Sequence, residues 1–227
     1  MNRERDARRA NHRLYESGAE VAAYLQHPYH AVRIRIARRL LVEHLAGPRP
    51  VVLELGGRTT LPEEFRTVSG DIELAALTPP NAVCLDAAGL LPIADGAVDG
   101  ILMGELIEHV YDTRRLLDEC HRVLRPAGLL VITTPNLATL QDRVRFLAGR
   151  SPRQVDPLHH YLSVHIRPFT AGKLVEVLAQ CGFRTRRLAS NHVVWRFGAG
   201  RELHSRLLAR LFPTLGGSLI CAAVRSG

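Results

Sequence analysis

Acidic residues follow three short apolar segments of the chain, and their types and spacing suggest a binding site. Glu54 lies in the run Val51-Val52-Leu53-Glu54-Leu55, Asp71 ends the segment 67–71, and Asp86 ends the segment 82–86. Carboxylates attract cationic groups and accept hydrogen bonds from hydroxyls and amines. These acids therefore predict a site for a cationic, hydrogen-bonding ligand, whereas a pyrophosphate would be repelled.

Histidines form a second group with chemical potential. His109 follows Glu108 directly, and it is either a general base, a group that orients an acceptor, or a structural histidine at a helix start. His159, His160 and His165 lie within seven residues, which predicts either contact with a substrate or an ordinary polar loop. No cysteine or acid completes a tetrahedral set with these three at a recognisable spacing, so we expect no metal site.

Short strands and amphipathic helices must position these residues. Apolar runs bounded by turn residues predict strands at 51–55, 67–71, 82–86, 98–103, 128–133, 183–189 and 218–225. Helical periodicity covers 11–46, with Gly47 and Pro48 ending it, and Asp112 and Thr170 are suitable caps for two later helices. Strands that alternate with helices predict a parallel sheet that binds ligands at the carboxyl ends of its strands.

A series of short motifs follows one order along the chain: Glu54-Leu55-Gly56-Gly57, Gly70-Asp71, Asp86-Ala87, Leu91-Pro92-Ile93-Ala94-Asp95, Glu108-His109-Val110, Glu119-Cys120-His121-Arg122-Val123-Leu124-Arg125-Pro126-Ala127-Gly128, Thr134-Pro135-Asn136, and His165-Ile166-Arg167-Pro168-Phe169-Thr170. This order resembles the class I S-adenosylmethionine-dependent methyltransferases, in particular the small-molecule and glycan type of the methyltransferase type 11 group. The resemblance is close over about residues 51–136 and looser to 227. The family fold is an α/β, Rossmann-like, seven-stranded, mostly parallel sheet with helices on both faces and an antiparallel last strand, to which we add an N-terminal helical segment.

The resemblance implies roles for the strand-end acids. In the family, the first acid helps to hold the methionine part of the cofactor, the second accepts hydrogen bonds from the ribose, and the third contacts the adenine amino group. Carried over, these are Glu54, Asp71 and Asp86. The sulfonium and ammonium groups of S-adenosylmethionine are cations, which fits an acidic site. The full implied cofactor-binding set is Glu54, Gly56, Gly57, Asp71, Ile72, Asp86, Ala87, Met103 and Glu105, and the candidate catalytic set is His109, His160 and His165.

The loop after the first strand departs from the family pattern. The usual loop is G-x-G-x-G, but here Gly56 and Gly57 are followed by Arg58, Thr59 and Thr60. The interval from Gly56 to Asp71 also leaves little room for a full helix. This shortened, altered loop motivates one alternative function, a non-catalytic relative that keeps the fold as a binding or partner module.

The charge distribution bears on a second alternative, an RNA methyltransferase. The 227 residues have 30 basic against 22 acidic side chains and a net charge of +8, yet the acidic middle (51–112) carries −9 between flanks of +5 and +12. No basic motif or aromatic stacking platform accompanies the flanks, so we expect nucleic acid to be an unlikely partner. One functional interpretation of the arginines is that they bind an anionic acceptor. For the arginines on the N-terminal helix, the simpler interpretation is a helix face exposed to solvent.

The composition of the chain limits the class of protein and the compartment that we expect. With 46% apolar residues the chain can fill a core, its apolar runs are too short to span a bilayer, and its N-terminus lacks a signal-peptide pattern. Four widely spaced cysteines indicate free thiols in a reducing compartment, hence a cytoplasmic protein. We expect an N-terminal helical segment (1–47) packed on a methyltransferase domain (48–227), with 137–170 as a substrate wall. The predicted reaction is O-methylation of a small molecule or sugar, with S-adenosylhomocysteine as product; the sequence does not indicate an oligomeric state.

Overall fold

The computed structural model describes residues 27–56, 61–72, 81–156, 158–159, 162, 165–197 and 200–227. Seven strands form one sheet in the order β3-β2-β1-β4-β5-β9-β6, and β7 and β8 form a separate hairpin. The strands are β1 (Val51–Leu55), β2 (Arg66–Asp71), β3 (Ala82–Cys84), β4 (Val98–Gly104), β5 (Leu124–Pro135), β6 (Phe183–Ser190), β7 (Val193–Arg196), β8 (Glu202–Ser205) and β9 (Ser218–Arg225). The helices are α3 (Pro28–His44), η2 (Ile107–His109), α4 (Thr113–Val123), α5 (Leu140–Leu147), α6 (Ala171–Gln180), α7 (Arg206–Leu211) and η5 (Pro213–Leu215).

The sheet has the direction pattern expected from the sequence. Strands β1 to β5 pair in parallel, whereas β9 runs antiparallel to both β5 and β6. The carboxyl ends of β1 to β5 therefore lie along one edge. This confirms the predicted Rossmann-like sheet with an antiparallel last strand.

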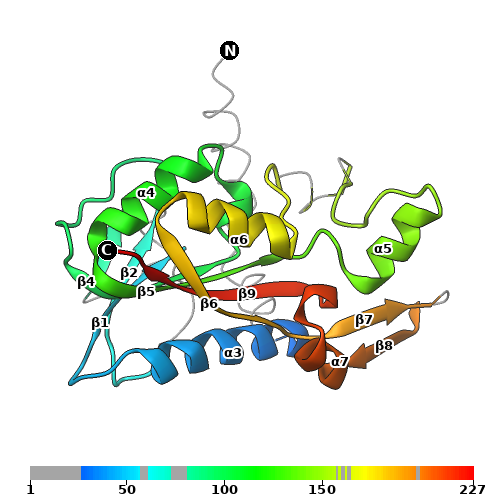
Figure 1. Ribbon diagram of the computed structural model, residues 1–227, viewed down its shortest axis with the longest axis horizontal. Coiled ribbons are helices and arrows are strands. Elements are labelled where there is room, and N and C mark those ends of the chain that lie inside the picture. Colours follow the sequence, from blue (N-terminus) through cyan, green and yellow to red (C-terminus); the bar gives the residue numbers. More distant parts are fainter. Residues whose placement is uncertain are drawn as a thin grey trace, which may run out of the picture.

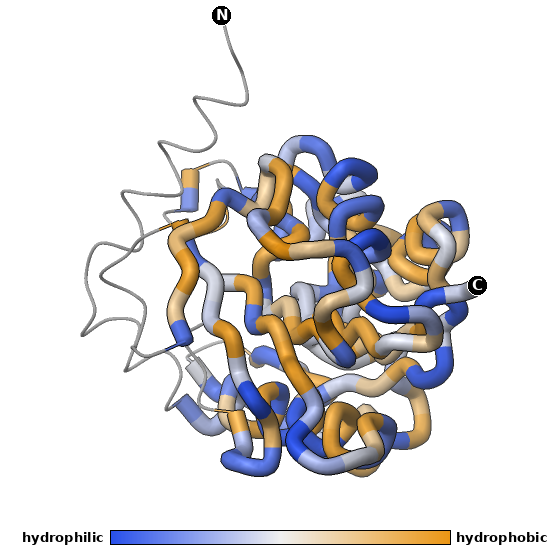
Figure 2. Tube along the Cα trace, turned by 90° about the vertical axis from the view of Figure 1, so that its left-hand side faces the viewer, coloured by the Kyte–Doolittle hydropathy of each residue, from blue (hydrophilic) through white to orange (hydrophobic). Residues whose placement is uncertain are grey.

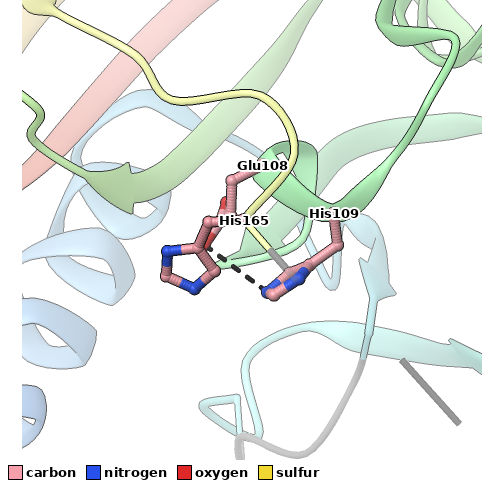
Figure 3. A group of neighbouring side chains, drawn as sticks. All are labelled: Glu108, His109 and His165. Atoms are coloured by element: carbon pink, nitrogen blue, oxygen red, sulfur yellow. Dashed lines mark ion pairs between the residues drawn. The ribbon is translucent and has the colours of Figure 1, made fainter. Parts of the chain in front are cut away.

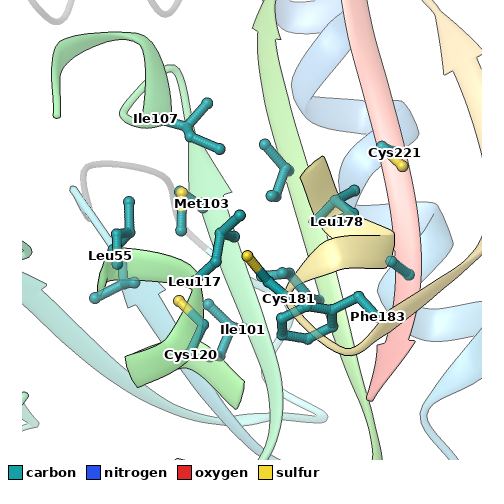
Figure 4. Packing of buried hydrophobic residues seen from close by; sticks show 14 of the residues in the cluster. Leu55, Ile101, Met103, Ile107, Leu117, Cys120, Leu178, Cys181, Phe183 and Cys221 are labelled. Atoms are coloured by element: carbon teal, nitrogen blue, oxygen red, sulfur yellow. The ribbon is translucent and has the colours of Figure 1, made fainter. Parts of the chain in front are cut away.

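Helices cover both faces of the sheet because its strands are apolar on both sides. Leu53 and Leu55 of β1 point into the cluster formed with α4 and α6, while Val52 points into the cluster formed with α3. The strand β5 divides in the same way, with Leu130 and Ile132 on one side and Leu129 and Val131 on the other. Figure 1 shows α4 and α6 on one face and α3 on the other, and Figure 4 shows the first cluster at close range. The view in Figure 2 shows many apolar segments inside the described trace and polar ones in its outer turns.

Local signals set the ends of the helices. Asp112 Oδ1 accepts a hydrogen bond from the Arg115 amide at 3.0 Å at the start of α4, and Thr170 Oγ1 accepts one from the Lys173 amide at 3.3 Å at the start of α6. Both predicted caps are confirmed. After α6, Gly182 adopts a φ of +78°, the left-handed conformation typical of the residue that follows a helix.

Three features differ from the expected elements. Helix α3 begins at Pro28, where the ring suits the first helical turn, and residues 11–26 of the predicted helix lie outside the described residues. Strand β5 starts at Leu124, four residues before the predicted strand at 128–133. The hairpin of β7 and β8 was not predicted, because β8 is exposed and lacks an apolar alternation.

Candidate active site at the carboxyl edge of the sheet

The strand-end acids lie at one edge, on neighbouring strands. Glu54 precedes the last residue of β1 and is buried, Asp71 ends β2, and Asp86 lies two residues after β3. These strands are consecutive in the sheet, so the order of the acids along the edge follows the order β1, β2, β3. The fold thus brings together three carboxylates that the sequence separates.

Backbone contacts hold the ends of these strands together. The Gly56 amide donates to the Gly70 carbonyl at 2.9 Å, and Gly56 has a φ of +72°, which a residue with a side chain rarely adopts. The Leu85 amide donates to the Asp71 carbonyl at 2.9 Å, and Asp86 Oδ1 accepts from the Ala88 amide at 2.9 Å. Gly57, the next member of the expected set, lies outside the described residues.

The side chains of the other predicted cofactor residues differ in exposure. Ile72 is half exposed after β2, and Ala87 is partly buried after Asp86. Met103, near the end of β4, is completely buried among the residues between the sheet and α4. Its side chain therefore contributes to the packing of the core.

Glu105 forms an ion pair with Arg33, a contact that was not predicted from the sequence. Its carboxylate lies 2.6 Å from Arg33 of α3, and both side chains are largely buried. Thr133 Oγ1 donates to Glu105 Oε1 at 3.1 Å, and the Glu105 backbone has a φ of +50°. Arg33 was expected on a solvated helix face; this was wrong, because the helix turns it towards the sheet edge. The buried position of Arg33 follows from its pairing with Glu105, which lies far away in the sequence.

Glu108, His109 and His165 form a compact group beyond the end of β4 (Figure 3). Their candidate ligand atoms all lie within 4.8 Å of one another. His109 Nε2 is 3.9 Å from Glu108 Oε1, and the two imidazole rings meet edge to face with centroids 4.8 Å apart. No sequence pattern predicts that His165, from a distant segment, lies next to Glu108.

Burial shapes the protonation of this group. Burial raises the pKa of Glu108 well above its ordinary value, and the nearby Glu105 carboxylate raises it further. Burial lowers the pKa of His165 to about 4, with a smaller contribution from His159. His165 is therefore a neutral imidazole at neutral pH.

The remaining histidines of the same segment are less well placed for chemistry. His159 is exposed, and its Nδ1 accepts a hydrogen bond from the Leu162 amide at 3.4 Å. His160, a predicted catalytic residue, lies outside the described residues. Of the three histidines, His165 is the one that the described structure places beside His109.

Two further acids, Asp99 and Glu119, make contacts that hold structural elements in place. Asp99 Oδ2 accepts from the Val51 amide at 2.7 Å and thus fixes the start of β1. Glu119 pairs with Arg122 at 2.8 Å, while Arg122 also donates to the carbonyls of Leu91 and Ile93. These contacts shape the turn before β4 and lie apart from the strand-end acids.

Comparison with known proteins agrees with the motifs. A family model described as a methyltransferase domain matches residues 63–132. A Mycolicibacterium smegmatis protein named "Probable S-adenosylmethionine-dependent methyltransferase" is 35% identical over 136 residues, which are 60% of this chain and 43% of that protein. A Coxiella burnetii malonyl-[acyl-carrier protein] O-methyltransferase is 33% identical over 100 residues, 40% of this chain and 36% of that protein. The chain thus spans less than half the length of these curated relatives.

Solved structures show the same fold at low sequence identity. The Burkholderia thailandensis 1,6-didemethyltoxoflavin-N1-methyltransferase, solved with S-adenosylhomocysteine, superposes with a TM-score of 0.63 at 18% identity and covers 100% of this chain and 91% of its own. A S-adenosylmethionine-dependent methyltransferase from Archaeoglobus fulgidus gives 0.55 at 20% identity, covering 85% and 94%. These structures and the strand order show that the chain has the Rossmann-like fold of the class I S-adenosylmethionine-dependent methyltransferases, and residues 63–132 match a methyltransferase domain.

Proposed function

We propose that this protein transfers the methyl group of S-adenosylmethionine to an oxygen atom of a small molecule or sugar. The observation that carries the proposal is the row of Glu54, Asp71 and Asp86 on three adjacent strand ends. A carboxylate row of this kind suits a cationic cofactor with free hydroxyls and an exocyclic amine. The name of the Coxiella burnetii relative supports oxygen as the acceptor atom.

The chemistry of the residues at the sheet edge supports this cofactor. Glu54 would bind the methionine part, Asp71 the ribose hydroxyls and Asp86 the adenine amine, with Ile72 and Ala87 beside the base. Gly56 leaves the turn after β1 without a side chain, so the backbone can approach a ligand closely. When bound, the cofactor supplies an electrophilic methyl group on a sulfonium. Glu105, anchored by Arg33, borders the same edge.

His109 and His165 lie on the acceptor side in this proposal. His109 follows the end of β4, His165 lies in the segment before α6, and their rings meet edge to face, so an acceptor between them and the sheet edge would be oriented by two imidazoles. A neutral imidazole accepts a proton from a hydroxyl that loses it on methylation. Most of the rate enhancement would come from holding the acceptor oxygen in line with the methyl group. His160 and the wall at 137–170 remain predicted acceptor contacts, and the boundary at residue 47 remains a prediction.

Labelled methyl transfer tests the proposal. The protein is incubated with S-adenosylmethionine carrying a deuterated methyl group and a small-molecule extract of its host, and products are followed by mass spectrometry. We expect a labelled methyl ether or ester with the wild type and with Asp118→Asn, an exposed acid on α4, but not with Asp71→Asn. Cofactor binding without labelled product from any extract would instead support the non-catalytic alternative.

A further inference from the structure

Within the described part of the chain, one carboxylate oxygen of Glu108 is buried without a hydrogen bond. Thr134 Oγ1 donates to Oε2 at 3.0 Å, but Oε1 has no hydrogen-bond partner among the residues that the structure describes. The Glu108 side chain is only 1% exposed. A buried polar atom left without a partner costs free energy, so such an atom calls for an explanation. Oε1 points towards the imidazole of His109, as Figure 3 shows.

The surroundings of this oxygen are those of a metal site. Two imidazoles and one carboxylate are ligands that first-row divalent transition metals favour. Ligand atoms that share one ion at about 2.2 Å lie at most about 4.4 Å apart, twice the bond length. The atoms of Glu108, His109 and His165 lie within 4.8 Å of one another, so a small inward movement is sufficient. Within the segment 159–165 no acid accompanies the histidines at a recognisable spacing, whereas the fold supplies the acid from the turn after β4.

Contacts around the group hold its members in place. The Arg167 amide donates to the Glu108 carbonyl at 3.0 Å, and the Arg167 side chain donates to the Tyr111 carbonyl at 2.9 Å. The Arg167 guanidinium also lies over the Tyr111 ring, 4.7 Å from its centroid. These bonds fasten the segment that carries His165 against the turn that carries Glu108 and His109. Thr134 orients the carboxylate, as the groups around metal ligands commonly do.

We propose that Glu108, His109 and His165 bind one divalent first-row transition-metal ion. The inference rests on the proposed methyl transfer and deepens it, because three protein ligands leave coordination positions open for the acceptor oxygen. A hydroxyl bound to the ion has a lowered pKa and releases its proton to solvent, leaving the more nucleophilic oxygen. His109 and His165 then act as ligands, and neither has to take the proton itself.

Cobalt binding tests the site without relying on activity. Untagged, chelator-treated full-length protein is titrated with Co²⁺ and followed by calorimetry and by visible absorption, whose ligand-field bands report the coordination. We expect one ion per chain, with affinity reduced about tenfold or more in His109→Ala, His165→Ala and Glu108→Gln. His204→Ala is the matched control, since His204 also lies beside a carboxylate, 2.8 Å from Glu202, but on the exposed hairpin. Circular dichroism confirms that each variant is folded.

Two outcomes separate this inference from the proposed function. If the wild type binds no more Co²⁺ than Glu108→Gln, or if only His204→Ala weakens binding, the metal site is refuted. S-Adenosylhomocysteine binding is measured separately in the presence of chelator. Cofactor binding without Co²⁺ binding would refute the metal site alone, whereas Co²⁺ binding without cofactor binding would refute the proposed function alone.

Discussion

The Arg33 guanidinium and the Glu105 carboxylate form an ion pair that is largely removed from water. Their side chains are 4% and 13% exposed, and 2.6 Å separates the paired atoms. The pair joins α3 to the turn after β4, next to the strand-end acids. It therefore links the packing of the N-terminal helix to the geometry of the site.

Removing Arg33 alone should cost more stability than removing the pair. In Arg33→Met the Glu105 carboxylate is left buried without its cation, which we expect to lower the free energy of unfolding by about 3–5 kcal/mol. The double variant Arg33→Met/Glu105→Gln has no unpaired charge and should recover part of that loss. Urea unfolding of the two single variants and the double variant measures the coupling. A double variant no more stable than Arg33→Met would contradict this account of the pair.

Glu119 should contribute stability only above acidic pH. The hydrogen bond from Arg122 is the main cause that lowers the pKa of Glu119 below its ordinary 4.5, although burial opposes it. A carboxyl with a lowered folded pKa stabilises the protein above its unfolded pKa, and this is lost as the pH falls through the folded value. We expect Glu119→Gln to lose about 1–2 kcal/mol at pH 7 and the difference from wild type to shrink below about pH 4.5. Chemical unfolding at several pH values measures it.

Glu176→Gln is the control for this comparison. Glu176 pairs with Lys173 at 2.8 Å, but both side chains are about half exposed. An exposed pair of this kind contributes about 0–1 kcal/mol, so its removal should change stability little at any pH. Equal losses in Glu119→Gln and Glu176→Gln would argue against a structural role for Glu119.

At the scale of elements, α3 is part of the sheet's second core. Ala37, Leu40 and Leu41 of this helix pack with Val52 of β1 and Val131 of β5. The helix thereby covers the face of the sheet opposite α4 and α6 (Figure 1). Arg33 lies on the same face of the helix, one turn before Ala37, so this packing also directs it towards the edge of the sheet.

Truncating the Leu41 side chain should test how much the packing of α3 contributes to the free energy of unfolding. Leu41 is completely buried, so Leu41→Ala should lower the free energy of unfolding by about 2–5 kcal/mol. The neighbouring Val42 is 50% exposed, and Val42→Ala should change it by about 0.5 kcal/mol or less. Thermal and urea unfolding compare the two. Similar losses in both variants would mean that α3 is not packed as described.

The elements that sequence patterns predicted well are those with local causes. The apolar runs at Val51–Leu55 and Ser218–Arg225 are strands because both of their faces are buried, and Asp112 and Thr170 cap helices because their side chains accept nearby amides. Long-range contacts were not predictable in this way. Neither the pairing of Arg33 with Glu105 nor the meeting of His165 with Glu108 leaves a periodic or spacing signal in the chain.

At the scale of the whole molecule, the basic charge is divided between two flanks and an acidic middle. The middle segment, 51–112, carries −9 and includes every strand-end acid, so the net charge of +8 says little about the site. No described helix is long and apolar enough to cross a membrane. The chain spans less than half the length of the curated relative from Mycolicibacterium smegmatis.

Titration with S-adenosylhomocysteine by calorimetry tests the central claim most directly. We predict binding with a dissociation constant below about 1 mM, which corresponds to more than about 4.1 kcal/mol. Asp71→Asn should weaken it about tenfold or more, because a hydrogen bond to a charged group contributes about 1.5–3 kcal/mol, while Asp118→Asn should bind like the wild type. No binding by the folded wild type at millimolar ligand, or equal binding by Asp71→Asn, would contradict a cofactor site at the carboxyl edge of the sheet.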